Sequence, residues 1–417
     1  MISPFRNPVL DPLYGDVEFE PAISDLATRP LVQRLRQIRL SNVDSLALPG
    51  IANVSRYEHA LGTAVLAARS GFAKRVLERV RVCFIAAALT HDTGISPFGH
   101  LMEEALSYVQ TEYHHESKWS VLLGSRSGEL GGVNLQLYLG YQSGLREWAE
   151  KFFGVDGSAV IESIIQGIRG RGEFGKAIVG DLDLDNLDNV TRAAFHMGLD
   201  VDRTLPLRLA ACLDDVDAQG ALFAEESVDL ARQWLELREQ VYSRFMLSVA
   251  DFSGKLMLLY SIIEALKAGV ITDADWIMTD GHLMELLLNS KREEISDPLR
   301  RWLISDLWDT TDLVWFEGKA PSLPALTSFA HDLSSDLSRI CFAYLIKDKR
   351  KRQITLRLGS KETVIIGEHP RQWLFGVGSP VRRTFTAKDT QMIVDKAQQR
   401  FDVQLAYPAE HVSSLFA

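Results

Sequence analysis

An apolar segment followed by a histidine and an aspartate constrains this chain more than any other feature. Residues 82–89 read VCFIAAAL, with no polar face, and His91 and Asp92 come soon after them. A helix that is apolar on all sides is buried inside a protein. A buried imidazole and carboxylate need a partner, and they are ligands suited to a divalent metal ion. The sequence therefore predicts a metal site at the end of a core helix.

Further histidines surround this pair in the sequence. Residues 55–116 hold five of the ten histidines of the chain. His59 stands at the head of a helical pattern, a PFGH turn ends at His100, and His115 precedes Glu116. We interpret this stretch as the centre around which the chain is organised.

A second His-Asp pair serves as an internal control. His331 and Asp332 precede LSSDL in an ordinary amphipathic stretch, with no glycine turn after them and no second histidine near. We interpret His331 and Asp332 as surface residues. His91 and Asp92 differ in having a buried helix before them, the turn at Gly94 after them and a histidine upstream.

Composition limits the classes of protein that fit. Of 417 residues, 46% are hydrophobic and 24% are charged, as in an ordinary soluble protein. The net charge of -10 argues against general affinity for a nucleic-acid backbone, although a local basic cleft stays open. The three cysteines lie far apart, so no disulfide framework or cysteine zinc site is indicated. Without a signal-peptide core or a long apolar run, we expect a cytoplasmic protein with no membrane partner.

The periodicity of the chain predicts a mainly α fold with a small C-terminal α+β subdomain. Helical patterns run through residues 23–40, 59–91, 99–110, 147–170, 226–270 and 280–317. After residue 345 come short strand patterns and a helix near 387–401. We therefore expect a helical domain over residues 1–345, with its core at about 50–200, and a subdomain over 346–417.

Two basic segments have more than one interpretation. Arg29, Arg34, Arg36 and Arg39 lie between the apolar positions of the first helical pattern, and residues 347–352 read KDKRKR. Either segment is a solvated face in the simplest interpretation. The first would otherwise bind phosphate, and the second would otherwise contact nucleic acid or a partner protein.

Four aspartates come just before one of the helical patterns. Asp181, Asp183, Asp185 and Asp188 precede residues 190–197. Acids at a helix start offset the positive end of the helix dipole. Four of them within eight residues exceed that need, so one is a candidate for a late metal ligand.

Taken together, these motifs resemble those of the HD-domain phosphohydrolases. The resemblance is carried by RYEHALG at 56–62, HDTG at 91–94 and PFGH at 97–100. It is closest to the deoxynucleoside triphosphate triphosphohydrolases (the dGTPase and SAM-and-HD-domain proteins). DPLYG at 11–15, QRLRQI at 33–38 and the late aspartates are similar to segments of that branch. The resemblance runs roughly from residue 7 to residue 313 and does not cover the tail.

The resemblance implies a mostly helical HD-domain fold with one divalent metal ion as cofactor. The implied ligands are His59, His91, Asp92 and Asp185. Two imidazoles and two carboxylates suit manganese, iron or magnesium better than structural zinc, although nickel, cobalt or zinc can also occupy such a set. The metal would lower the pKa of a water molecule and offset charge on phosphate oxygens.

The resemblance also implies roles for further residues. A histidine near the reacting phosphate would handle protons, which suits an imidazole near neutral pH. The implied catalytic residues are His115, Glu116 and Asp92, and the implied substrate-binding residues are Arg56, Arg192, His100 and Asp188.

The chain departs from the pattern of that branch at four positions. Ile95 stands where the triphosphohydrolases carry a further histidine, and Asn186 where they often carry a lysine that meets phosphate. Asn189 replaces an aromatic residue, and the polar residue that meets the sugar falls near Leu40 or Ser41. The metal set is complete, whereas the contacts to triphosphate and sugar are fewer.

Three functions remain open at this point. The first is hydrolysis of deoxynucleoside triphosphates to deoxynucleoside and tripolyphosphate. The second is an HD phosphatase or phosphodiesterase that acts on another nucleotide or on single-stranded nucleic acid. The third is a non-hydrolytic metal-binding regulatory protein. We favour the first, with a nucleotide as substrate, single-stranded nucleic acid as an alternative partner, and assembly into a homo-oligomer of two or more chains, as is common in the branch.

Overall fold

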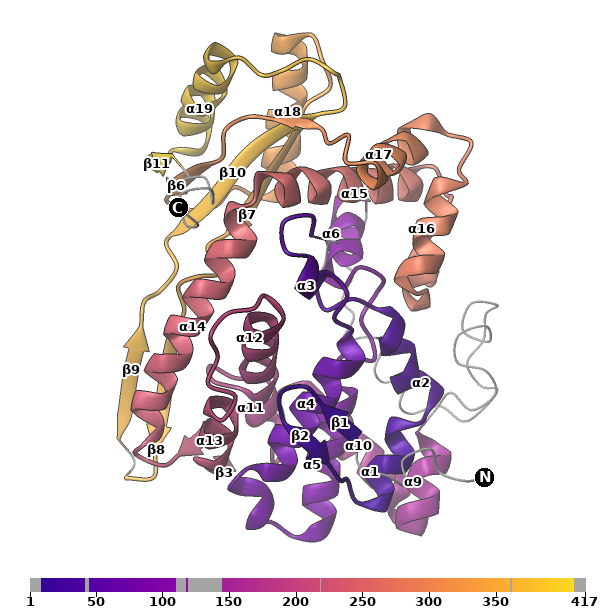
Figure 1. Ribbon diagram of the computed structural model, residues 1–417, viewed down its shortest axis with the longest axis vertical. Coiled ribbons are helices and arrows are strands. Elements are labelled where there is room, and N and C mark those ends of the chain that lie inside the picture. The colour runs from indigo at the N-terminus through magenta and orange to yellow at the C-terminus, as the bar shows by residue number, and fades with distance from the viewer. Residues whose placement is uncertain are drawn as a thin grey trace.

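The computed structural model describes residues 9–41, 45–109, 118, 145–217, 219–360 and 362–408. Figure 1 shows a body of packed helices, with a lobe of strands and two helices at one end. The late helix α14 (Ser227–Leu247) runs along one side of the body, and α15 (Val249–Lys267) crosses above it. The prediction of a mainly helical fold with an α+β part toward the C-terminus is confirmed.

The N-terminal segment is a hairpin followed by short helices. Strands β1 (Val9–Asp11) and β2 (Gly15–Val17) pair antiparallel, and α1 (Pro21–Ala27), α2 (Pro30–Gln33) and η1 (Arg34–Gln37) follow. The helix expected over residues 23–40 is therefore interrupted, since Pro30 begins a new helix at its first position.

One arginine of that region is not on a solvated face. Arg34 is buried, and its guanidinium donates to the carbonyl oxygens of Ile95, Trp276, Ile277 and Met278. Those carbonyls belong to segments far away in the sequence, so the charge pattern of the helix alone could not predict the burial.

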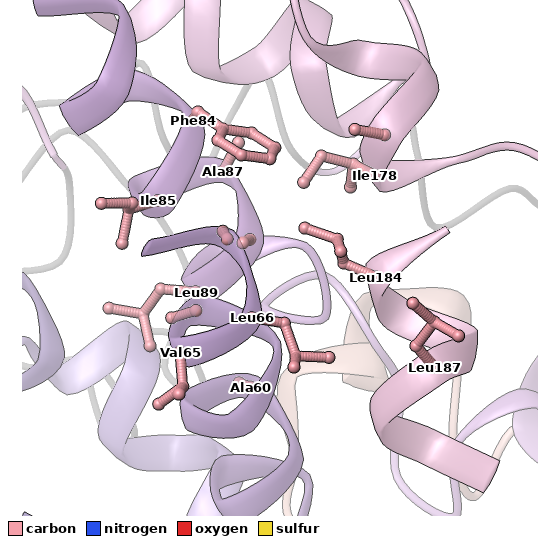
Figure 2. Packing of buried hydrophobic residues seen from close by; sticks show 14 of the residues in the cluster. Ala60, Val65, Leu66, Phe84, Ile85, Ala87, Leu89, Ile178, Leu184 and Leu187 are labelled. Atoms are coloured by element: carbon pink, nitrogen blue, oxygen red, sulfur yellow. The ribbon is translucent and has the colours of Figure 1, made fainter. Parts of the chain in front are cut away.

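The main hydrophobic core lies between four helices. These are α4 (Arg56–Arg69), α5 (Glu78–Thr90), α10 (Gly157–Ile168) and α12 (Leu184–His196). Figure 2 shows side chains of α4, α5 and α12 gathered in one cluster, with Leu66, Leu89 and Leu187 among them. As predicted, α5 is buried from Val82 to its end.

Shorter elements surround this core. They are α3 (Pro49–Ala52), η2 (Phe72–Lys74), α9 (Arg146–Phe153), η3 (Gly154–Asp156), α11 (Gly175–Ile178) and α13 (Leu205–Ala211). The loop region expected at 122–145 lies outside the described residues except for its last position.

A second core forms where α15 packs against α6 (His100–Val109) and α17 (Glu293–Leu303), next to η4 (Asp273–Ile277) and α16 (Asp280–Leu288). Within the described part of the chain, no single helix has the length and apolar character needed to cross a membrane. The pair α14 and α15 passes such a test only when both helices are counted together across a bend of 67°.

The C-terminal lobe is a five-stranded sheet with two helices. Its strands are β5 (Asp309–Thr310), β6 (Val314–Glu317), β7 (Phe342–Lys347), β10 (Gln372–Ser379) and β11 (Gln404–Pro408), and its helices are α18 (Leu323–Leu337) and α19 (Ala387–Phe401). Strand β10 lies between β6 and β7. The lobe thus begins before residue 346, and the expected division between 345 and 346 falls inside β7.

The helical pattern expected up to residue 317 also ends earlier, because β6 carries the run Val-Trp-Phe, which fits a buried strand better than a helix surface. His331 and Asp332 lie on α18 and are exposed, as predicted.

A smaller sheet joins the tail to the helical body. Strands β3 (Leu213–Asp217) and β4 (Gly220–Phe223) form a hairpin, and β4 pairs in parallel with β8 (Gln353–Leu358), which pairs with β9 (Thr363–Gly367). Two further hydrogen bonds fix the same junction: Arg352 Nη2 donates to Gly180 O at 2.9 Å, and Thr355 N donates to Asp181 Oδ2 at 3.1 Å. The tail therefore packs against the loop that precedes α12.

Candidate metal centre and substrate cavity

Helix α4 brings the first histidine into the core. Ser55 caps the helix, and its Oγ accepts a hydrogen bond from Glu58 N at 3.3 Å. His59 comes one turn later and is 1% exposed. Helix α5 packs alongside α4 and ends in Thr90, so that His91 and Asp92 project from its C-terminus toward His59.

Two imidazoles and one carboxylate converge between α4, the end of α5 and the first turn of α12. His59 Nε2 lies 3.0 Å from Asp185 Oδ1, and His91 Nε2 lies 3.6 Å from the same oxygen. One ligand atom from each of the three residues lies within 4.8 Å of the others, and this set could hold a metal ion.

The hydrogen bonds of the two imidazoles fit metal binding. His91 Nδ1 donates to Ala88 O at 2.7 Å, and His59 Nδ1 donates to Asp188 Oδ2 at 2.7 Å. Both Nε2 atoms therefore face Asp185, where an ion could bind, as is usual where the other nitrogen is held by an outer partner. His91 Nε2 is buried without a hydrogen-bond partner. A buried polar atom in this state is costly unless something binds it, so these residues fit a divalent ion.

The electrostatics around these residues favour a cation. Burial alone would lower the pKa of His59, but its hydrogen bonds to Asp185 and Asp188 raise that pKa to about 10. Burial alone would raise the pKa of Asp185, but the hydrogen bond from His59 and the nearby imidazole of His91 hold it well below its usual range. The site therefore stabilises positive charge between the imidazoles, where a proton or a metal ion supplies it.

Asp92 lies beside this set and is held by an arginine. Its Oδ2 lies 3.7 Å from His91 Nε2, 4.0 Å from His59 Nε2 and 2.7 Å from Arg56 Nη1. Burial would raise the pKa of Asp92, but Arg56 and the two histidines keep it well below its usual range. The carboxylate is therefore ionised, and its role as a fourth ligand stays a prediction.

Asp188 and Arg192 lie behind His59. Both side chains are fully buried. Arg192 Nε and Nη2 donate to the two oxygens of Asp188, each at 2.9 Å, and Tyr14 Oη donates to Asp188 Oδ1 at 2.8 Å. The sequence analysis expects these two residues to bind substrate. Their burial on the Nδ1 side of the imidazole instead suits a positioning role for His59.

The guanidinium of Arg192 connects two further elements, β1 and α4, to this point. It donates hydrogen bonds to Asp11 Oδ2 at 3.0 Å and to Glu58 Oε1 at 2.6 Å. His196 Nε2 lies within hydrogen-bond distance of the same Glu58 oxygen, at 2.8 Å. Gly62 on α4 makes the close approach possible: a Cβ there would stand 2.1 Å from both Arg192 Nη2 and Asp188 Oδ1.

The turn after Asp92 is fixed by an aspartate on α16. Asp280 Oδ1 accepts a hydrogen bond from Phe98 N at 2.7 Å, and its Oδ2 accepts one from Arg39 N at 2.9 Å. Phe98 has a φ of 55°, a left-handed conformation that costs a non-glycine residue energy. This turn places His100 at the start of α6, where its Nδ1 lies 3.1 Å from Glu103 Oε2.

A cavity of about 330 Å³ opens beside the candidate metal ligands. This volume is at the lower end of the range for small-molecule sites. Arg56, Asp92, His100 and Asp185 line it, so two of the four expected substrate-binding residues face the cavity. The remaining lining residues are Leu40, Ser41, Ser45, Ile51, Asn186, Asn189, Ala193, Tyr242, Phe245, Met246, Asp251, Phe252, Lys255, Ile346 and Lys349.

The four late aspartates have separate tasks. Asp183 caps α12 and accepts from Asn186 N at 2.8 Å, and Asp181 holds the tail strand β8. Asp185 joins the two histidines, and Asp188 orients one of them. His115 and Glu116, the expected proton-handling residues, lie outside the described residues.

Sequence reasoning missed the outer partners Tyr14 and Glu58 and the cavity residues Lys255 and Lys349. Tyr14 and Asp188 are 174 positions apart, and no local pattern marks such a pair. The basic run at 347–352 was a signal for Lys349, but nothing in the sequence indicates which of its residues faces a cavity.

Comparison with known proteins agrees with this geometry. No family model matches the chain. It is 30% identical over 152 residues to the deoxynucleoside triphosphate triphosphohydrolase SAMHD1 of Bos taurus, covering 35% of this chain and 24% of that protein. It is 31% identical over 116 residues to the human SAMHD1 protein, covering 25% of this chain and 18% of that one. The match thus spans about a quarter or less of these relatives' length.

A crystal structure of a phosphohydrolase from Bacteroides thetaiotaomicron has the same fold. Its TM-score is 0.63 at 15% identity, and the match covers 90% of this chain and 99% of that one. The sequence and fold similarities relate the chain to the HD-domain, triphosphohydrolase-like proteins, as the motifs predicted.

Proposed function

We propose that this chain is a metal-dependent phosphohydrolase that converts deoxynucleoside triphosphates into deoxynucleoside and tripolyphosphate. The observation that carries the proposal is the convergence of His59, His91 and Asp185 at a cavity, with His91 Nε2 buried and unbonded. A divalent ion bound there would supply activation of a water molecule and neutralisation of charge on phosphate oxygens. The similarity to SAMHD1 supports the substrate class.

The chain's own residues would hold the substrate in place for this reaction. Arg56 lines the cavity and carries a second nitrogen, Nη2, whose contact to Leu40 O is long at 3.5 Å. A phosphate oxygen would be a stronger acceptor for that nitrogen. Water attacks the phosphorus that bears the nucleoside oxygen, the bond to that oxygen breaks, and the oxygen takes up a proton. We propose that His115, with Glu116 beside it in sequence, handles the protons of this step.

A second candidate is a phosphatase or phosphodiesterase on another nucleotide or on single-stranded nucleic acid. It is favoured by Asn186 and Asn189, which line the cavity next to Asp185 with neutral amides. Neutral side chains grip a triphosphate less strongly than cations do. A regulatory protein with a structural metal is less well supported, because two of the candidate ligands, Asp92 and Asp185, line an open cavity.

A product assay tests the proposal. The purified protein is incubated with manganese, and separately with magnesium, and with each dNTP, each NTP, mononucleotides and short single-stranded DNA, and products are separated by ion-exchange chromatography. Deoxynucleoside and tripolyphosphate from a dNTP are expected. Orthophosphate from mononucleotides, or shortened DNA, would favour the second candidate. Metal retention without turnover of any compound would contradict both enzymatic assignments.

A variant of the proton-handling residue separates its role from metal binding. His115→Ala should slow turnover and leave the metal content unchanged, which inductively coupled plasma mass spectrometry measures. Loss of metal in this variant would show that His115 acts as a ligand.

A further inference from the structure

The lining of the cavity contains two chemically different groups of charged residues. Asp92, Asp185 and Arg56 line the part next to the histidines, while Lys255 of α15 and Lys349 of the β7–β8 connection contribute two lysines. These lysines come from elements outside the helices that carry the metal ligands. Their presence in the lining calls for an explanation, because buried or clustered cations are normally paired.

Lys255 is compensated only in part. Its side chain is 19% exposed, its Nζ lies 3.4 Å from Glu104 Oε2, and it packs 4.8 Å from the centre of the Tyr344 ring. Glu104 is shared, since its Oε2 also accepts the hydroxyl of Tyr344 at 2.9 Å. Burial lowers the pKa of Lys255, and the nearby charge of Lys349 lowers it further. Among the described residues, Glu104 is the acid that lies within 4.0 Å of either lysine, and it is shared with Tyr344.

Among the described residues, Lys349 is one of two cations of the basic run without an acidic partner, and Lys347 is the other. Arg350 pairs with Asp348 at 2.9 Å, Lys351 pairs with Glu239 at 3.1 Å, and Arg352 lies 3.8 Å from Asp183. Among the residues that the structure describes, no carboxylate lies within 4.0 Å of the exposed Lys349. Three of the five cations of the run are therefore paired with acids, and Lys349 is the member of the run that lines the cavity.

The cavity also has apolar lining residues and one further acid. Tyr242, Phe245, Met246 and Phe252 line the cavity together with the lysines. The acidic lining residue Asp251 is engaged by Ser45 Oγ at 2.6 Å and by Leu46 N at 3.0 Å. An anion bound beside the lysines would therefore meet two ammonium groups, and the oxygens of Asp251 already accept hydrogen bonds from Ser45 and Leu46.

We propose that Lys255 and Lys349 form an anion subsite that binds the phosphate groups of a substrate beyond the one that reacts at the metal centre. This proposal rests on the proposed function, and it places the polyphosphate chain of that substrate against the part of the cavity lined by Lys255 and Lys349. The tail thereby contributes directly to the cavity, although it supplies no metal ligand. The wall next to Asp185 carries the neutral amides of Asn186 and Asn189, so the two lysines would supply positive charge for these phosphate groups.

Binding of inorganic tripolyphosphate to the metal-free protein tests the subsite without relying on turnover. Isothermal titration calorimetry at fixed ionic strength compares the wild-type protein with Lys349→Gln, Lys255→Met and Lys351→Gln. Lys351→Gln is the matched control, because it removes a charge from the same run outside the cavity. We expect Lys349→Gln to weaken binding roughly fivefold and Lys255→Met roughly tenfold or more, with the control within about twofold.

Several results would overturn the subsite. These are a wild-type protein that does not bind tripolyphosphate, equal affinity in all four proteins, or an equal loss in the Lys351→Gln control. Short single-stranded DNA that binds in a lysine-dependent way where tripolyphosphate does not would assign the two lysines to a nucleic-acid backbone and also overturn it. A thermal unfolding scan checks that Lys255→Met folds, and the exposed Lys349→Gln provides the test if it does not.

The proposed function can fail separately. Lysine-dependent tripolyphosphate binding without dNTP hydrolysis would support the subsite and contradict the triphosphohydrolase. Hydrolysis of dNTPs with a KM that neither lysine variant raises would support the triphosphohydrolase and contradict the subsite.

Discussion

The chain contains two histidine-aspartate pairs with the same sequence and opposite surroundings. His91 and Asp92 end a buried helix and face His59 and Arg56, whereas His331 and Asp332 lie on the exposed surface of α18. Asp332 does have a partner, Arg400 at 2.7 Å, but both side chains are about half exposed. The His-Asp dipeptide alone therefore does not predict a metal site. Its chemistry depends on burial, which removes water and leaves other protein groups as the only partners.

The largest expected effect is at the buried pair. Asp92→Ala should remove the carboxylate that balances Arg56 beside the two imidazoles, so metal retention and activity should be lost together. We expect turnover to fall by about three orders of magnitude or more. Metal content and dNTP hydrolysis measured on the same preparation check this, with Asp332→Ala as the matched control. Full activity in Asp92→Ala would show that the buried pair matters no more for catalysis than the exposed pair.

The next effect concerns the buried guanidinium. Arg192→Met should lower the free energy of unfolding by about 3–5 kcal/mol, because Asp188 and Asp11 would be left as uncompensated buried charges. Urea denaturation followed by circular dichroism measures the change. A loss below about 1 kcal/mol would mean that water reaches this network and that it behaves like a surface pair.

A smaller effect, on metal affinity, is expected when Asp188, the hydrogen-bond partner of His59, is replaced by an amide of the same shape. Asp188→Asn should weaken metal affinity by roughly 10–100-fold, the usual cost of losing an outer carboxylate. Titration against a competing chelator, below the unfolding temperature of the variant, measures the affinity. Unchanged affinity would show that Asp188 serves only the stability of the fold.

The smallest effect is at the exposed pair. Arg400→Met removes the partner of Asp332, and we expect a change in the free energy of unfolding of less than about 1 kcal/mol with no change in metal content, because solvent screens both charges. Thermal unfolding of Arg400→Met and Arg192→Met, measured side by side, compares the stability losses of the two variants. An equal destabilisation of the two variants would remove the distinction between the pairs.

The local part of the site was predictable from the sequence, and its outer part was not. The burial of α5 follows from the run VCFIAAAL, and His59, His91 and Asp185 stand in recognisable local patterns. The helix expected over residues 23–40 failed at Pro30, a signal visible in the sequence but outweighed by the apolar periodicity. Long-range partners such as Tyr14 for Asp188, or the distant carbonyls around Arg34, leave no periodic trace, because they depend on which elements the fold brings together.

The same reason explains the expected division of the chain. A change of composition near residue 346 was real, but a sheet is defined by pairing, and β7 pairs with β10 across that point. Strand periodicity identified the strand segments, but it could not show which strand each of them pairs with.

The parallel pairing of β4 with β8 limits where the chain can be truncated. A chain cut at residue 345 would lose β8 and β9, and β4 would be left with an open edge that invites pairing with other molecules. The contacts of Arg352 and Thr355 to the loop before α12 would disappear as well. The helix that carries Asp185 is thus anchored by residues that follow it by more than 150 positions. Truncated forms should aggregate instead of retaining a smaller, working catalytic unit.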